Sequence, residues 1–411
     1  MRTLVIAIVL APLLHSWPAS AQVPKLKVVH NFAAFGSTND GSIPYGPLSV
    51  DTEGNLYGVT VDGGTGCLGY GCGTAFQLSP SLGGNWNETI LYNFTSNDGS
   101  PWGPLAISAG NIFGTTMGPS IDSGVYELSP GSAGWNHRVL YGSGAGPGLV
   151  FDLDGNLYGE IGPGQSYSGA IGELSPGTES WTYTQLYSFC TADGCPDGWN
   201  MLYPPAWDMK GNLWGTTFEG GIGRPACTNF SGGCGVIFAM TPNGNGTWTY
   251  HVVHRFASSP TDGQFPNGGL VMDPLGNFYG ITGGGGLYGN GTIFQFSYNH
   301  GKLQGRYIYN FPNCLHGCYP QGTLARDNSG NLYGMAQGGT NSCGGLSCGV
   351  VYRLAPQTNG TWKYSVLVNL SETTGGVLPF YGLTLDGKGH MFGVTSSFGA
   401  YGGGTAFEIT Q

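Results

Sequence analysis

The pentapeptide GNLYG, Gly54 to Gly58, decides the fold, because the chain repeats it. Copies or close variants begin at residues 54, 110, 155, 211, 276, 330 and 389, so successive copies start 45 to 65 residues apart. A repeat of roughly 40 to 60 residues is typical of propellers and solenoids. The spacing is too even for chance and too uneven for a fibre, so the sequence predicts seven similar units in a row.

Each unit has the pattern of a four-stranded antiparallel sheet. In the first unit we expect strands at residues 46–51, 55–60, 73–79 and 87–94, with the turn D-x-x-G-N joining the first two. The strands carry apolar residues on both faces, as sheets stacked between neighbouring sheets require. No segment shows a sustained helical period. The seven units therefore predict an all-β, seven-bladed β-propeller.

The two ends of the chain complement each other. The last unit stops at residues 404–410, after its third strand, and residues 25–32 match the fourth strand of other units. We expect this first strand to complete the last blade, which would close the ring and remove open sheet edges. A solenoid needs no such complementary ends, so the pattern favours the propeller.

The composition indicates a compact, acidic, glycine-rich protein. Aromatic residues make up 13% of the 411 residues and charged residues only 9%, so there is enough apolar material for a core. The 77 glycines follow no Gly-X-Y period and fit many tight turns between short strands. A formal net charge of −10 repels a phosphate backbone, so we expect no nucleic-acid partner.

The N-terminus has the features of an export signal. Arg2 precedes an apolar run, and small residues end at Ala21, where we expect cleavage. The run is too short to span a bilayer, although an uncleaved anchor is the alternative. No later segment is long and apolar enough for a membrane helix. We therefore expect a signal peptide at 1–21 and one propeller domain at 22–411, secreted to the extracellular space or periplasm.

Ten cysteines fall into five close pairs. An even number in an exported chain is typical of disulfides, although connections between pairs remain possible. A metal site is less favoured, because the pairs lack the Cys-x-x-Cys spacing and no histidine pair accompanies them, and we expect neither a metal nor a cofactor. The pairs are Cys67 and Cys72, Cys190 and Cys195, Cys227 and Cys234, Cys314 and Cys318, and Cys343 and Cys348.

The repeat resembles a known family. The pattern G-x-L-x-x-D-x-x-G-N-L-Y-G-x-T-x-x-G-G, followed by G-x-x-F-x-L-S and a strand ending Tyr-x-Phe, is similar to the Gloeo/Verruco (GloVer) tandem repeat over nearly all of residues 25–411. The resemblance implies an exported bacterial repeat protein, and it supplies no activity and no catalytic residues. Many members carry a C-terminal anchor, whereas this sequence ends at Gln411 without one, which favours release over surface attachment.

One face of the propeller is expected to carry the binding site. The loops from second to third strands and from blade to blade emerge together, are the long ones, and hold all five cysteine pairs. Rings that stack on C–H surfaces, together with amides that bond hydroxyls, suit a neutral glycan, although any one ring could instead pack between blades. The candidate ligand-binding residues, six at the start of first strands and Trp199 nearby, are Tyr45, Trp102, Trp199, Tyr203, Asn267, Gln321 and Phe380. Gly146 occupies the aligned position in the third unit.

Three carboxylates depart from the repeat. Most aspartates recur at turn or Asp-Gly positions and are expected to be scaffold, and His30 and His254 replace tyrosines of fourth strands. Glu160 stands where other units have Val, Thr, Ile or Met, and Asp62 and Glu219 occupy matching loop positions. A glycoside hydrolase would need two such acids about 5 to 10 Å apart, and a polysaccharide lyase a base with a cation. These enzymes are one alternative to glycan binding by a monomer, and a cell-envelope structural or protein-interaction module is another.

Overall fold

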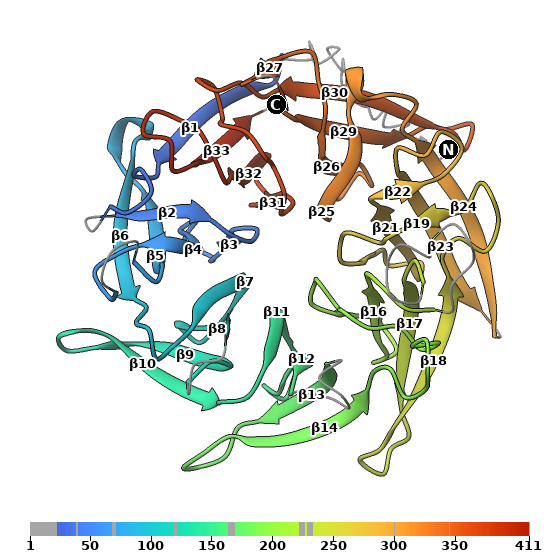
Figure 1. Ribbon diagram of the computed structural model, residues 1–411, viewed down its shortest axis with the longest axis horizontal. Helices are drawn as coiled ribbons and strands as arrows, with labels where there is room; N and C mark the ends of the chain where they lie inside the picture. Colours follow the sequence, from blue (N-terminus) through green and yellow to red (C-terminus); the bar gives the residue numbers. More distant parts are fainter. Residues whose placement is uncertain are drawn as a thin grey trace, which may run out of the picture.

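Seven antiparallel sheets stand around one axis in the computed structural model, which confirms the predicted seven-bladed β-propeller (Figure 1). The structure describes residues 23–410 except 38–39, 68–70, 119–121, 163–168, 222–226, 228–232, 300 and 345. The expected signal peptide therefore lies outside the described residues. Among those described, no helix is long and apolar enough to cross a membrane.

Each blade orders its strands from the axis outward in chain order. The strands of blades 1 to 3, innermost first, are β3 (Ser49–Val50), β4 (Leu56–Gly63), β5 (Thr74–Pro80) and β6 (Trp86–Asn93); β7 (Ser100–Ser108), β8 (Asn111–Met117), β9 (Val125–Gly131) and β10 (Gly134–Tyr141); β11 (Ala145–Phe151), β12 (Leu157–Ile161), β13 (Ala170–Ser175) and β14 (Thr182–Ser188). Those of blades 4 to 6 are β15 (Ala206–Trp207), β16 (Leu213–Thr217), β17 (Val236–Pro242) and β18 (Trp248–Arg255); β20 (Val271–Met272), β21 (Asn277–Thr282), β23 (Thr292–Asn299) and β24 (Lys302–Asn310); β25 (Cys318–Arg326), β26 (Leu332–Gln337), β29 (Val350–Pro356) and β30 (Trp362–Asn369).

Blade 7 is built from both ends of the chain, as the sequence predicts. Its inner strands are β31 (Thr384–Leu385), β32 (His390–Thr395) and β33 (Thr405–Thr410), and its outer strand is β1 (Lys25–Asn31). β1 runs antiparallel to β33, with Lys25 opposite Thr410 and Asn31 opposite Thr405. In Figure 1 the blue first strand accordingly lies beside the red last one. The ring is thus closed by main-chain hydrogen bonds.

Short elements decorate the loops. β2 (Gly41–Pro44) pairs with the far end of β4, and two small hairpins lie outside the blades. The hairpins pair β19 (Gly263–Gln264) with β22 (Gly284–Gly285) and β27 (Ser342–Cys343) with β28 (Leu346–Ser347), and single 3-10 turns are η1 (Leu82–Gly84) and η4 (Cys314–His316).

The core consists of seven apolar clusters, one between each pair of neighbouring blades. Second strands serve two clusters at once. Leu56 packs toward blade 7, and the next residue, Tyr57, packs toward blade 2. Apolar side chains on both faces of a blade are therefore explained by burial on both sides, and the seventh cluster, between blades 7 and 1, exists only because the ring is closed.

The GNLYG repeat is explained by one aspartate-centred turn. In blade 1 the Asp51 carboxylate accepts hydrogen bonds from the main-chain N of Asn55, from its Nδ2 and from the Tyr57 hydroxyl, at 2.8, 2.8 and 3.0 Å. Gly54, at φ 93°, supplies the left-handed residue that the turn needs. The same three-donor pattern recurs at Asp152, Asp208, Asp273 and Asp327, with a tryptophan donor at Asp208.

The final glycine of the repeat makes room for a ring. A Cβ at Gly58 would lie 2.5 Å from Cζ of Phe76 on the third strand of the same blade. The equivalent ring belongs to Tyr126, Phe238, Phe294, Tyr352 and Phe407 in blades 2, 4, 5, 6 and 7. The pentapeptide therefore combines the turn glycine, an asparagine and a hydroxyl or indole group that donate to the preceding aspartate, a core leucine and a space for an aromatic side chain.

First strands are less regular than predicted. The expected strand at 46–51 is regular only at β3, because Gly46 has φ 107° and Pro47 has no N–H to donate. At this level the blades touch main chain to main chain. A Cβ at Gly46 would lie 2.6 Å from the Gly103 carbonyl oxygen, and one at Gly103 would lie 2.5 Å from Gly148 N. Gly46 and Gly103 also line the axial cavity described below.

Candidate functional site

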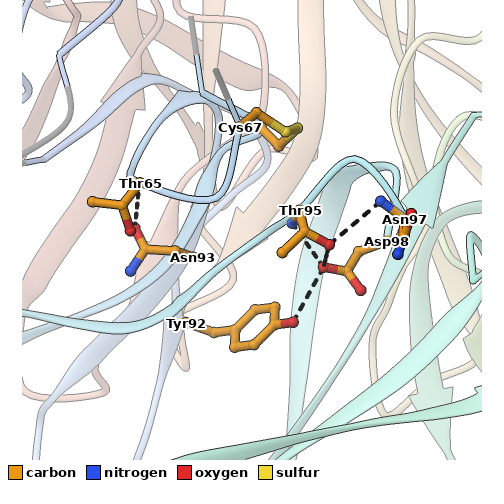
Figure 2. Close-up of a disulfide and its surroundings, with 8 residues drawn as sticks. Thr65, Cys67, Tyr92, Asn93, Thr95, Asn97 and Asp98 are labelled. Atoms are coloured by element: carbon orange, nitrogen blue, oxygen red, sulfur yellow. Dashed lines mark hydrogen bonds between the residues drawn. A yellow bond between two sulfur atoms is a disulfide. The ribbon is translucent and has the colours of Figure 1, made fainter. Parts of the chain in front are cut away.

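All five predicted local disulfides are formed, and all lie on one face. The cysteines pair as 67–72, 190–195, 227–234, 314–318 and 343–348. Because every blade runs its strands outward in antiparallel order, the loops from second to third strands and those between blades share that face, which we call the disulfide face. Figure 2 shows the first disulfide with Thr65, whose main-chain N donates to Asn93 Oδ1 at 3.0 Å.

The Asp-Gly aspartates of the disulfide face hold loops. The Asp98 carboxylate accepts from the Tyr92 hydroxyl at 3.1 Å and from Thr95 Oγ1 at 2.8 Å (Figure 2). Asp197 repeats this with Tyr187 and Thr191. In both residues one carboxylate oxygen holds the loop, whereas Asp197 Oδ1 is buried with no hydrogen-bond partner among the described residues.

Asp262 shows how strongly these loops hold a carboxylate. Burial raises its pKa, but hydrogen bonds from His254, Ser258 and Tyr307 outweigh burial and lower the pKa to about 2. His254 is therefore a partner of this loop aspartate, in agreement with its expected structural role.

One junction could hold a metal ion. His30 Nε2 lies 3.3 Å from Asp40 Oδ2 and 3.5 Å from Glu88 Oε1, and one ligand atom from each residue lies within 4.8 Å of the others. At several other junctions the corresponding side chains are stacked rings, as for Tyr187 and Tyr250 at 3.8 Å. Between β1 and blade 1 this cluster therefore occupies the place that a ring stack has at those junctions.

A cavity of about 270 Å³ lies on the propeller axis. Every blade contributes to it, which places it on the axis, and it brings together six of the seven predicted ligand-binding residues. The six are Tyr45, Trp102, Tyr203, Asn267, Gln321 and Phe380. A Gly-Pro or Pro-Gly step recurs beside the rim position in blades 1 to 3, and the other lining residues are Gly46, Pro47, Gly103, Pro104, Pro147, Leu202 and Tyr381.

The cavity has an aromatic side and an amide side. Tyr45 packs edge-on against Trp102 at 5.0 Å and tilted against Tyr381 at 4.4 Å, so blades 7, 1 and 2 form one aromatic arc. Asn267 and Gln321 lie on blades 5 and 6. No charged side chain lines the cavity among the described residues, and burial raises the pKa of the Tyr45 hydroxyl, which stays neutral. The arrangement offers rings and uncharged hydrogen-bonding groups to a ligand.

Trp199 and Gly146 lie elsewhere. Trp199 pairs with Glu219 through the main chain and packs into the apolar cluster between blades 3 and 4, so its ring is used for folding and does not line the axial cavity. This corrects the expected grouping of Trp199 with the rim residues, because the loop turns it outward into the core. Gly146 lines a neighbouring recess instead.

That recess, of about 340 Å³, contains Glu160 and shares Trp102, Pro147 and Leu202 with the axial cavity. Burial raises the pKa of Glu160 to about 8, against a hydrogen bond from the Met201 main chain that lowers it. The side chain nevertheless retains some exposed surface. A carboxyl that is surrounded by protein but open to a recess, and protonated at neutral pH, is a functional-site signal.

Asp62 and Glu219 do not join Glu160. The three residues belong to blades 1, 4 and 3, and neither Asp62 nor Glu219 lines the Glu160 recess or the axial cavity. Burial raises the pKa of both carboxyls. Their matching positions are explained by the main chain: the hydroxyls of Thr60 and Thr217 donate to the carbonyls of Asp62 and Glu219 at 2.9 Å. Glu160 is the one carboxylate among the described residues that line the recess.

The fold and this face define a seven-bladed β-propeller stapled by disulfides on the side where an uncharged axial cavity opens. The chain belongs to the Gloeobacter/Verrucomicrobia repeat family, whose pattern matches residues 148–407, more than half of its length. This confirms the resemblance seen in the repeat. No protein of curated function matches the chain.

Solved structures share the architecture. An ancestral GH74 enzyme is similar with a TM-score of 0.57 and 11% identity over 90% of this chain and 48% of that one. A protein from Lactobacillus plantarum gives a TM-score of 0.52 and 10% identity over 83% of this chain and 88% of that one. A chain of the mitotic checkpoint complex gives 0.52 and 10% over the whole of both chains. At such identities the likeness shows the propeller fold alone.

Proposed function

We propose that the protein binds a neutral extracellular carbohydrate in the axial cavity of the disulfide face. The observation that carries the proposal is the composition of this cavity: an aromatic arc of Tyr45, Trp102 and Tyr381 together with the amides of Asn267 and Gln321, and no charged group among the described lining residues. Aromatic faces stack on the C–H surface of a sugar, and amides donate to and accept from its hydroxyls.

A location outside the cytoplasm is part of the proposal. Five disulfides in one domain support it, because reducing compartments keep such pairs as thiols. The export signal expected at residues 1–21 supports it as well.

The enzyme alternative has less support. Acid-pair hydrolysis needs a second carboxyl within about 10 Å of the first, and Glu160 shares its recess with no other carboxylate among the described residues. Glycan binding without turnover is therefore the better proposal.

The test is binding to a glycan array, followed by titration of the best ligand by calorimetry. Trp102→Ala and Tyr203→Ala should each weaken binding at least tenfold, because they remove rings that line the cavity. Tyr401→Ala is the matched control: Tyr401 is 65% exposed on the same face and does not line the cavity, so this variant should bind as the wild type does. Unchanged binding by both cavity variants, with their folds intact, would refute the proposal.

A further inference from the structure

Blade 3 departs from the other blades at two positions that face each other. Where other blades have Tyr45, Trp102 or Tyr203 it has Gly146, and where they have Val59, Thr115 or Val394 it has Glu160. A Cβ on Gly146 would lie 2.6 Å from Glu160 Oε2, so a larger side chain there would displace the carboxyl.

A second glycine completes the space for the carboxyl. Gly169, at the start of the third strand, lies against Glu160 Oε1, where a Cβ would collide with it. The blade thus exchanges a bulky rim side chain for a carboxyl with glycine on both sides. The exchange opens the recess that shares Trp102, Pro147 and Leu202 with the axial cavity.

The walls of the recess are mainly apolar, with Met117, Met201 and Leu202 among them, and its uncharged polar residues are Ser143 and Asn200. Glu160 is its only charged or titratable group among the described lining residues, which come from β7, β8, β12, the segment 143–147, Gly162, Gly169 and the segment 200–202. Tyr183 lies beyond Gly162, with Tyr141 stacked on it at 4.3 Å, and burial raises the pKa of Tyr183 to about 12, so it stays neutral. Glu160, whose pKa burial raises to about 8, therefore presents an uncharged O–H donor in an apolar space.

We propose that the Glu160 recess is an acyl-binding subsite, which takes the acetyl group of an acetylated sugar bound in the axial cavity. The Glu160 O–H donates to the acetyl carbonyl oxygen, and the methyl group contacts Met201 and Leu202. This inference rests on the proposed glycan binding and adds the substituent that the glycan carries. A bare hydroxyl would leave the apolar walls without a partner, whereas an acetyl group satisfies both the donor and the walls.

The first experiment compares acetylated and unacetylated probes in pairs. Chitohexaose, with acetamido groups, is compared with cellohexaose, and O-acetylated xylan is compared with the same xylan after deacetylation. The acetylated member of at least one pair should bind at least tenfold more tightly, and the two pairs distinguish amide from ester. Equal binding within both pairs would overturn the subsite and leave glycan binding standing. If no glycan binds at all, both proposals fail.

The second experiment tests whether Glu160 acts as a hydrogen-bond donor to the ligand or has only a structural role. Chitohexaose affinity of the wild type should be constant below pH 7 and about tenfold lower at pH 9, because only the protonated carboxyl donates. Glu160→Gln keeps an N–H donor and cannot ionise, so its affinity should be high and independent of pH. Glu160→Val, which copies Val59 and Val394, should lose the acetyl preference at every pH. The proposal would be overturned if the affinity of Glu160→Gln fell between pH 7 and pH 9 as that of the wild type does. It would also be overturned if a folded Glu160→Val still preferred the acetylated probe.

Discussion

Tyr279 donates its hydroxyl hydrogen to Asp273 Oδ2 at 3.0 Å, whereas the hydroxyl of Tyr126 is buried with no hydrogen-bond partner among the described residues. Both side chains are almost fully buried. Tyr126 occupies the third-strand ring position where blades 1 and 4 have Phe76 and Phe238. The same residue type is thus satisfied at one repeat position and unsatisfied at another.

Removing each hydroxyl should therefore have opposite effects on stability. Tyr279→Phe should lower the free energy of unfolding by about 1.5 to 3 kcal/mol, because it removes a hydrogen bond to a charged acceptor. Tyr126→Phe should raise it by up to about 1 kcal/mol, because the hydroxyl is desolvated without compensation. Tyr352→Phe should act like Tyr126→Phe, since the Tyr352 hydroxyl is also buried with no partner in the described part of the chain. Chemical denaturation of the three variants checks this, and a loss of stability in Tyr126→Phe would contradict it.

The disulfides should differ in their contribution. Replacing Cys343 and Cys348 by serine should lower the free energy of unfolding by more than the roughly 2 kcal/mol expected from loop entropy, because both residues are buried in the core between blades 6 and 7. Replacing Cys190 and Cys195 should cost about 2 kcal/mol or less, since both are partly exposed in a surface loop. Thermal unfolding of the two double variants measures the order, and a reversed order would show that burial does not decide it.

Glu160 should make the protein less stable as the pH rises. Its pKa is about 8 in the fold and near 4.5 when unfolded, so between these values the unfolded chain releases a proton that the fold keeps. The free energy of unfolding should fall across this window by a few kcal/mol, since one pKa unit is worth about 1.4 kcal/mol. In Glu160→Gln the decrease should be smaller. Denaturation curves at pH 5 and pH 8 test this. An equal decrease in the free energy of unfolding for the wild type and Glu160→Gln would contradict it.

Asp262 should give the opposite dependence at acid pH. Its pKa falls from 3.8 to about 2 on folding, so its stabilisation is complete above pH 3.8 and is lost as the pH drops through 2. Asp262→Asn should lower the free energy of unfolding by about 2 kcal/mol at pH 6 and by much less at pH 2. Acid titration of stability for the two proteins supplies the measurement. A cost that does not depend on pH would mean that shape, and not charge, makes Asp262 important.

Much of the fold was predictable because each repeat residue has a local task. The turn needs a carboxylate, an amide and a glycine within five residues, so its spacing is visible in the sequence. Closure of the ring by residues 25–32 was predictable because the last unit has only three strands, and these residues match the missing fourth strand. The shortness of β3 was not predictable from the sequence. It follows from the close approach of Gly46 to Gly103 on the neighbouring blade, which depends on the diameter of the ring.

The candidate site was predictable to the extent that it follows the repeat. Aligning the units brought Tyr45, Trp102 and four other residues to the axis, since the ring places equivalent positions at one level. Trp199 lies outside the alignment, and the sequence does not indicate which way its loop turns it. Glu160 was visible as an exception, but its raised pKa depends on walls that other segments supply, Met201 among them.

Closure of the ring by β1 has a consequence for biosynthesis. Its partner β33 ends at Thr410, 385 residues after Lys25, so at about 5 to 20 residues per second the ribosome needs roughly 20 to 80 s to make the strand that β1 requires. Blades 1 to 6 have all their strands before then. β1 therefore has no partner until β33 has been made, and until then it is an unpaired strand that could pair with another chain.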